Sequence, residues 1–121
     1  MDICIVDDSN VVRNLVKKAL EMHGYSDFVE ASDGVDALEK IRGKQQDIGL
    51  YVLDVNMPNM DGITLVQEIR KINGETPIIM LTTETDKAKM TKAKELGATG
   101  WIIKPFETEK FISVIDMFLK K

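Results

Sequence analysis

The sequence predicts an α/β domain in which five parallel strands form a doubly wound sheet with helices on both faces. Short apolar runs rich in β-branched residues alternate with longer stretches whose apolar residues recur at helical spacing. Three of the short runs are apolar throughout, which is typical of strands covered on both faces. This alternation favours parallel strands joined by right-handed helical crossovers.

The five predicted strands are the short apolar runs. They span Ile3–Val6, Phe28–Ala31, Leu50–Leu53, Ile78–Leu81 and Trp101–Ile103. The first, third and fourth are the continuous runs, so they are expected at the covered centre of the sheet.

Five helices are predicted between and after these strands. The two strongest apolar stripes comprise Val12, Leu15, Val16, Ala19 and Leu20, and then Phe111, Val114, Ile115, Phe118 and Leu119. The weaker stripes comprise Val35, Leu38 and Ile41, then Leu65, Val66, Ile69 and Ile72, then Met90, Ala93 and Leu96. Four glycines follow helical stretches, in the position that favours glycine at a helix C-terminus: Gly24, Gly43, Gly74 and Gly97.

The composition indicates one globular domain over residues 1–121, with no output domain. Apolar residues make up 44% of the chain and charged residues 30%, a balance that allows a buried core. The net charge is −4 without a basic cluster, so nucleic acid is not an expected partner. No apolar run suits a signal peptide or a membrane span, and the single cysteine, Cys4, excludes an internal disulfide. We therefore expect a cytoplasmic protein with no membrane partner, in which Cys4 is a small buried residue.

Polar residues follow four of the strands, at the edge of a doubly wound sheet where ligands bind. They are Asp7 and Asp8, Asp54, Thr82 and Thr83, and Lys104. Most have a structural explanation, since Asp8 or Ser9 and the threonines suit helix caps and Lys104 suits the surface. Asp54 lacks one, because a proline and a turn-like segment separate it from the next helix.

A cluster of three carboxylates needs a cation. Two carboxylates about 4 Å apart repel by roughly 4 kcal/mol at an effective dielectric constant of about 20. Mg²⁺ relieves this repulsion, since it takes oxygen ligands and suits sites that also hold phosphate. With Lys104 ready for a second anion, Asp54 is suited to form an aspartyl phosphate.

The sequence resembles receiver domains of two-component response regulators along essentially its whole length. Four separated motifs carry the resemblance: Val6-Asp7-Asp8-Ser9, the segment from Asp54 to Gly62 (DVNMPNMDG), Leu81-Thr82 and Lys104-Pro105-Phe106. The single-domain chemotaxis regulators of the CheY type are the most similar, through NMPNMDG and Thr82-Thr83-Glu84. The resemblance implies a flavodoxin-like (βα)5 fold with strand order 2-1-3-4-5.

The resemblance also implies a role for each matched position. Asp54 accepts a phosphoryl group from a kinase histidine and takes part in binding Mg²⁺. Asp8 binds Mg²⁺ directly, Asp7 binds it through water, and the main-chain carbonyl of Asn56 completes the set. Lys104 pairs with the phosphoryl oxygens, and its bond to Pro105 is a cis peptide. Thr82 moves inward to donate its hydroxyl to the new phosphate.

Three further positions are matched to the family's switch. Trp101 stands where a smaller aromatic is usual; it either swings inward with Thr82 or simply covers an edge strand. Thr83 carries a methyl group that narrows access to Asp54. Glu84, together with Asn56, occupies a position that tunes phosphate lifetime. The output face is expected over Thr85–Leu96, Trp101–Ile103 and Thr108–Lys120, where four lysines of the fourth helix either face solvent or meet an acidic partner.

The expected partners are a sensor histidine kinase, a downstream target such as the flagellar motor switch, and a phosphatase. The chain would be a stoichiometric phosphoacceptor that assists its own phosphorylation and dephosphorylation, rather than an enzyme. A phosphorelay intermediate and the isolated receiver domain of a larger regulator are alternatives. A phosphohydrolase of the haloacid dehalogenase type is disfavoured because its Asp-x-Asp motif is absent after the first strand. A flavin carrier is disfavoured because Asp7 and Asp8 would repel a flavin phosphate.

Overall fold

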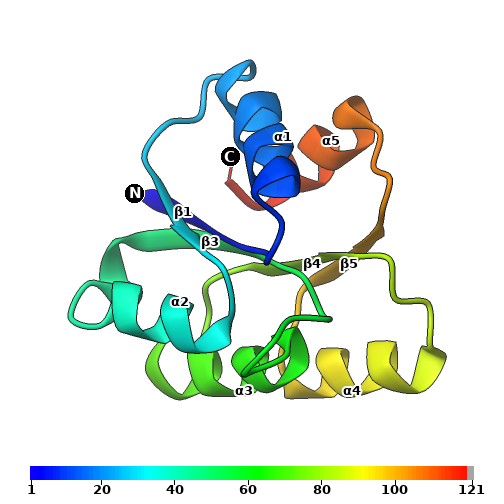
Figure 1. Cartoon of the computed structure of the whole chain (residues 1–121). Coiled ribbons are helices and arrows are strands. Elements are labelled where there is room, and N and C mark those ends of the chain that lie inside the picture. The colour runs from blue at the N-terminus through cyan, green and yellow to red at the C-terminus, as the bar shows by residue number, and fades with distance from the viewer. Residues whose placement is uncertain (120–121) are drawn as a thin grey trace.

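The computed structural model describes residues 1–119; Lys120, the last residue of the expected output face, and Lys121 lie outside the described residues. Five strands and five α-helices alternate, with one short 3-10 helix, η1 (Gln45–Asp47), before the third strand (Figure 1). The strands are β1 (Asp2–Val6), β2 (Phe28–Ala31), β3 (Ile48–Leu53), β4 (Ile78–Thr82) and β5 (Gly100–Ile103). The α-helices are α1 (Asn10–Glu21), α2 (Gly34–Ile41), α3 (Gly62–Ile72), α4 (Lys87–Leu96) and α5 (Thr108–Leu119).

All five strands are parallel and lie in the order β2-β1-β3-β4-β5, which confirms the predicted sheet. Helices α1 and α5 cover one face, and α2, α3 and α4 cover the other (Figure 1). Buried side chains form one apolar cluster on each face, because alternate residues of each strand point to opposite sides. The fold is therefore the flavodoxin-like arrangement that the resemblance implies.

Side-chain caps start four of the helices. Ser9, Asp33, Asp61 and Asp86 each accept a hydrogen bond from a main-chain N–H in the first turn of the helix that follows. The interpretation of Ser9 as a cap is thus confirmed, whereas Asp8, Thr82 and Thr83 are not caps. Asp54 has no helix directly behind it, since α3 begins only at Gly62.

Several helix residues expected in the core lie at the surface. Leu15, Val35 and Ile72 are 54%, 44% and 45% exposed, because each lies at the margin of its apolar stripe, beyond the strip that the sheet covers. The glycine prediction is correct for Gly97, the left-handed C-cap of α4. It is wrong for Gly74, where Asn73 is the C-cap of α3 and the glycine has no positive φ.

Cys4 is fully buried in β1, an interior strand of the sheet, as expected. No helix within residues 1–119 has the length and hydropathy needed to cross a bilayer.

Candidate functional site

The site lies at the carboxyl edge of the sheet, where β1 and β3 end side by side. Val6 pairs with Leu53 in the parallel ladder, so the residues that follow them, Asp7 and Asp54, leave the sheet together. The Asp54 N–H donates to the Val6 carbonyl at 2.9 Å, and this bond carries the ladder one step beyond the strands. The register therefore brings together two carboxylates that are 47 positions apart in the sequence numbering.

Three carboxylates gather at this edge. Asp7, Asp8 and Asp54 each offer an oxygen, and these oxygens lie within 4.8 Å of one another. Asp7 and Asp54 are only 4% and 8% exposed, whereas Asp8 faces solvent. A compact set of carboxylate oxygens with one open side suits a hard cation that keeps water ligands, so the residues present fit Mg²⁺.

Lys104 offsets part of this negative charge. Its Nζ lies 2.7 Å from Asp7 Oδ2 and 3.3 Å from Asp54 Oδ2. Burial by itself would lower the pKa of the Lys104 ammonium, but the hydrogen bond to Asp7 and the nearby carboxylate charges outweigh it, so the pKa is raised. Lys104 is thus a firmly protonated cation that bridges two of the three carboxylates. The peptide bond from Lys104 to Pro105 is cis, as the resemblance implies.

Asp54 is held in one orientation. Its Oδ1 accepts the Val55 N–H at 2.7 Å, while Oδ2 faces Lys104. Gly62 lies against the main chain here, since a Cβ on it would stand 1.9 Å from the Asp54 carbonyl oxygen. Any other residue at position 62 would displace the backbone of Asp54 itself.

The loop between β3 and α3, which contains Asn56, is anchored from α2. Asn59 has a positive φ of 65° and donates from Nδ2 to Asp33 Oδ2 at 2.7 Å. Asp33 is a buried carboxylate that also caps α2, so one side chain fixes both segments. The sequence analysis missed Asp33, Asn59 and Gly62 as parts of the site. The positive φ that Asn tolerates and the Asp-Gly pair at the start of a helix are the signals that could have indicated them.

Thr82 is fully buried at the end of β4. Its Oγ1 accepts the Glu84 N–H at 3.1 Å, so the hydroxyl oxygen is held by the loop that leads to α4. Thr83 is exposed and lines an apolar groove of about 370 Å³ beside Lys104, together with Val12 and Leu15 of α1. The groove shares Lys104 with the acidic cluster, but Asp7, Asp8 and Asp54 are not among the residues that line it.

Trp101 connects this loop to the edge strand β5. The half-buried indole donates its Nε1–H to the Glu84 carbonyl at 3.2 Å. Glu84 is also tied to α4 by an ion pair with Lys89 at 3.0 Å, which lowers the pKa of the Glu84 carboxyl. Trp101 therefore links β5 to the loop that Thr82 contacts.

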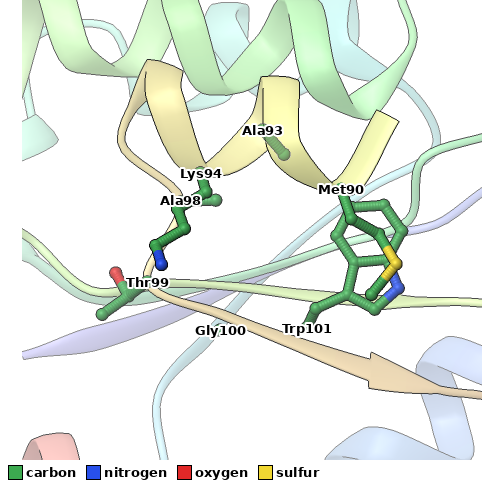
Figure 2. Close-up of a pocket in the computed structure, with 7 residues that line it drawn as sticks. All are labelled: Met90, Ala93, Lys94, Ala98, Thr99, Gly100 and Trp101. Atoms are coloured by element: carbon green, nitrogen blue, oxygen red, sulfur yellow. The ribbon is translucent and has the colours of Figure 1, made fainter. Parts of the chain in front are cut away.

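A pocket of about 290 Å³ opens beside Trp101, between α4 and β5. Figure 2 shows Met90 and Ala93 lining the pocket from α4 and Trp101 lining it from β5. Ala93 is the one buried residue of α4, and the four lysines of this helix are all exposed. They are Lys87, Lys89, Lys92 and Lys94. Helix α4 thus has a single buried residue, and its exposed lysines place positive charge near an apolar pocket.

Known proteins are similar to this chain in fold and in sequence. Residues 3–116 match the response regulator receiver domain family. The chain is 38% identical over 121 residues to chemotaxis protein CheY1 of Helicobacter pylori strain J99, covering 98% of this chain and 97% of the relative. The structure of chemotaxis protein CheY4 of Vibrio cholerae, crystallized at low pH, aligns with a TM-score of 0.88 and 38% identity over 98% of each chain. A chain in the CheX–CheY–BeF3–Mg²⁺ complex of Borrelia burgdorferi aligns with a TM-score of 0.93 and 26% identity, over 100% of this chain and 90% of that one.

Proposed function

The chain belongs to the response regulator receiver domain family, whose members are phosphoacceptors in two-component signalling, and we propose that Asp54 is its phosphorylated residue. The supporting observation is the orientation of its carboxylate. The Val55 N–H occupies Oδ1, and Oδ2 points toward a lysine ammonium at 3.3 Å. Asp54 also belongs to the cluster whose oxygens suit Mg²⁺, as an acceptor of a highly charged group requires.

In the transfer step, an Asp54 carboxylate oxygen attacks the phosphorus of a phosphohistidine on the kinase. A new O–P bond forms, the N–P bond breaks, and its electron pair returns to the imidazole nitrogen, which takes up a proton. Asp54 thereby changes from a single negative charge to a group of about −1.5 to −2. The site must accommodate this additional charge.

Asp7, Asp8, Asp54 and the main-chain carbonyl of Asn56 are the proposed Mg²⁺ ligands. When bound, the ion supplies positive charge that offsets the charge on the transferring phosphoryl oxygens. Asp8 supports this assignment, because it is exposed and lacks the lysine contact that Asp7 and Asp54 share. Its carboxylate is therefore available to a cation from solvent.

Lys104 and Thr82 are proposed to stabilise the phosphoryl group. Lys104 already contacts the Asp54 carboxylate, so it needs only a small shift to pair with a phosphoryl oxygen. Thr82 accepts a hydrogen bond from Glu84, which leaves its own hydroxyl hydrogen free to donate to that group. A movement of Thr82 toward the site would then pull on the loop before α4.

The proposed output runs through that loop. Thr82 contacts the Glu84 N–H and Trp101 contacts the Glu84 carbonyl, so displacement of this one peptide segment changes the setting of the indole and of α4. We assign the partner-binding face to α4 and the pocket beside Trp101, with a chemotaxis target as the partner. Within this proposal the partner is the flagellar motor switch, the donor is a sensor histidine kinase, and a phosphatase ends the signal.

The test combines intact mass with tryptophan fluorescence after addition of Mg²⁺ and acetyl phosphate. One added phosphoryl group is expected in the wild-type protein and none in Asp54→Asn. Asp47→Asn, which removes a carboxylate from η1, is the matched control and should be phosphorylated normally. A change in Trp101 fluorescence that follows the mass change would support the switch.

If acetyl phosphate gives no phosphorylated protein, a phosphorylated histidine kinase is the next donor. Failure with both donors, or phosphorylation that persists in Asp54→Asn, would rule out Asp54 as the acceptor.

A further inference from the structure

Arg13, in the first turns of α1, lies next to the acidic cluster but has no role in the function proposed above. Its Nη1 donates to the main-chain carbonyl of Asp7, and its Nη2 donates to Oδ1 of Asn10. These two acceptors stand at the two ends of the short segment that contains Asp8. The guanidinium therefore spans the loop from which two of the three cluster carboxylates project.

The guanidinium is itself held from the sheet. Its Nε lies 3.3 Å from Glu30 Oε1, and the other oxygen of that carboxylate accepts from Lys17 Nζ at 3.0 Å. The hydrogen bond from Lys17 is the main reason that the pKa of the Glu30 carboxyl is lowered, so Glu30 stays ionised beside Arg13. The Arg13 side chain is only 12% exposed. A planar fork with donors on three fixed partners is a rigid brace rather than a free cation.

We propose that Arg13 is a positioning residue for Mg²⁺, which acts by holding the β1–α1 loop so that the carboxylates of Asp7 and Asp8 converge. This inference rests on the proposed metal site. It adds a residue that is not itself a Mg²⁺ ligand. Groups that orient metal ligands typically contribute about 10–100-fold in metal affinity. Arg13 reaches the ligands through the Asp7 carbonyl and the Asn10 side chain.

The alternative is that Arg13 influences the site only as a charge, and the two roles predict opposite signs. A positive charge beside the cluster repels a dication, so its removal would strengthen Mg²⁺ binding. Loss of a brace would weaken binding, because the loop would have to be ordered when the ion binds. The direction of the change in affinity therefore distinguishes positioning from charge.

The experiment measures Mg²⁺ affinity by isothermal titration calorimetry for the wild type, Arg13→Gln, Arg13→Lys and Lys17→Gln. Lys17→Gln is the matched control, because it also removes one positive charge that is paired with Glu30, but Lys17 does not contact the β1–α1 loop. We expect Arg13→Gln to lower the affinity about tenfold, Arg13→Lys to lower it less, and Lys17→Gln to leave it unchanged or slightly higher. Equal or tighter binding in Arg13→Gln overturns the inference.

Phosphorylation at varied Mg²⁺ gives a second readout. In Arg13→Gln, the half-saturating Mg²⁺ concentration should rise about tenfold, while the extent of phosphorylation at saturating Mg²⁺ stays near the wild-type value. An extent that stays low at saturating Mg²⁺ would contradict a positioning role.

Asn10→Ala keeps every charge and removes one anchor of the brace, so it decides the question if Arg13→Gln does not fold. A severalfold weaker Mg²⁺ affinity supports the brace, and an unchanged affinity overturns it. If the wild-type protein binds no Mg²⁺ at all, the proposed metal site fails together with the brace. Failure of the wild-type protein to bind Mg²⁺ thus contradicts both proposals. Normal wild-type binding with unchanged affinity in the variant contradicts the brace alone.

Discussion

The two edges of the sheet use polar side chains in opposite ways. At the carboxyl edge, two of the three clustered carboxylates share one lysine, and the third, Asp8, faces solvent. At the amino edge, Asn73 donates to the Gln45 carbonyl at 2.9 Å and accepts from the Thr76 hydroxyl. Asn73 and its neutral partners thus satisfy one another, although Gln45 Oε1 beside them is buried without a hydrogen-bond partner, whereas like charges face one another at the other edge.

Arg70 is a charged residue at the amino edge, and its guanidinium donors also have hydrogen-bond partners. Its Nε and Nη2 donate to the Gly97 carbonyl at 3.1 and 2.7 Å, and its Nη1 donates to the Asn73 carbonyl at 2.9 Å. A cation that closes the carbonyl ends of α3 and α4 stabilises the fold. The amino edge thus serves stability, while the carboxyl edge keeps an electrostatic conflict that a bound cation would resolve.

The sharpest challenge to this comparison is Asp8→Asn, which removes a carboxylate from the cluster. We expect Mg²⁺ affinity to fall by more than about tenfold, because one anionic oxygen ligand is lost. We also expect the metal-free protein to unfold about 2–5 °C higher, since relief of like-charge repulsion adds on the order of 1 kcal/mol. Calorimetric titration and thermal unfolding in a chelator measure the two effects.

Asp47→Asn at η1 is the control for the loss of one negative charge. A lower unfolding temperature for Asp8→Asn than for this control would mean that the cluster is not a source of strain.

The complementary change at the amino edge is Asn73→Ala. It removes the partner of the Thr76 hydroxyl and one of two donors to the Gln45 carbonyl, which keeps the Ile48 N–H, so we expect a loss of about 1–3 kcal/mol in the free energy of unfolding. Phosphorylation with acetyl phosphate should keep its wild-type extent in the folded protein. Urea unfolding followed by circular dichroism gives the stability, with the exposed Asn14→Ala as the matched control.

An Asn73→Ala variant that kept its stability but lost phosphorylation would contradict the assignment of stability to the amino edge and of function to the carboxyl edge.

Alkaline pH should weaken both edges, although for different reasons. Burial raises the pKa of Tyr51 near the amino edge, while the hydrogen bond to Asp7 and the carboxylate charges outweigh burial and raise that of Lys104. A group whose pKa is higher in the folded state contributes fully below its unfolded pKa. That contribution is lost as pH rises through the folded value. We therefore expect stability to fall above about pH 10.

Tyr51→Phe tests the amino-edge share of this fall. The variant should lose stability less steeply between about pH 10 and 12, by up to about 1.4 kcal/mol per pH unit. Urea unfolding midpoints across that range, compared with those of the wild type, measure the slope. An unchanged slope would assign the alkaline response to other groups.

Between the two edges we expect the sheet to stay closed to reagents in solution, and the reactivity of the Cys4 thiol measures this. The side chain is fully buried in the interior strand β1, and this burial raises the pKa of its thiol to about 12. We expect no modification by iodoacetamide at pH 8 in the native protein and full modification in urea. Rapid labelling of the folded protein, followed by mass spectrometry, would show that β1 opens without global unfolding.

The strands and the strand-tip residues could be predicted from the sequence because both depend on local chemistry. A strand covered on both faces must be apolar throughout, so Leu50–Leu53 and Ile78–Leu81 were recognisable, and the structure extends each run by one or two residues. An aspartate at the end of such a run is conspicuous for the same reason. Asp7 and Asp54 are therefore recognisable as candidate site residues from the sequence alone.

The helices were predicted less completely, since burial depends on what lies opposite. The apolar stripe of α1 is broader than the surface that covers it, and Leu15 is left beside a groove rather than in the core. The spacing of apolar residues gives the direction of a helix face but not its covered width. Only the packed neighbours set that width.

The sequence by itself determined the parallel α/β sheet and which acidic, hydroxyl and ammonium groups arrive at its carboxyl edge. The tertiary structure alone decided which of these groups touch, including the lysine bridge from Lys104 to Asp7 and Asp54. It also paired two supporting residues with partners that no local pattern predicts: Asn59 with Asp33, 26 positions apart, and Arg13 with Glu30, 17 positions apart. The reason is physical: apolar periodicity acts within one element, whereas hydrogen bonds and ion pairs between elements exist only after the sheet has brought their ends together.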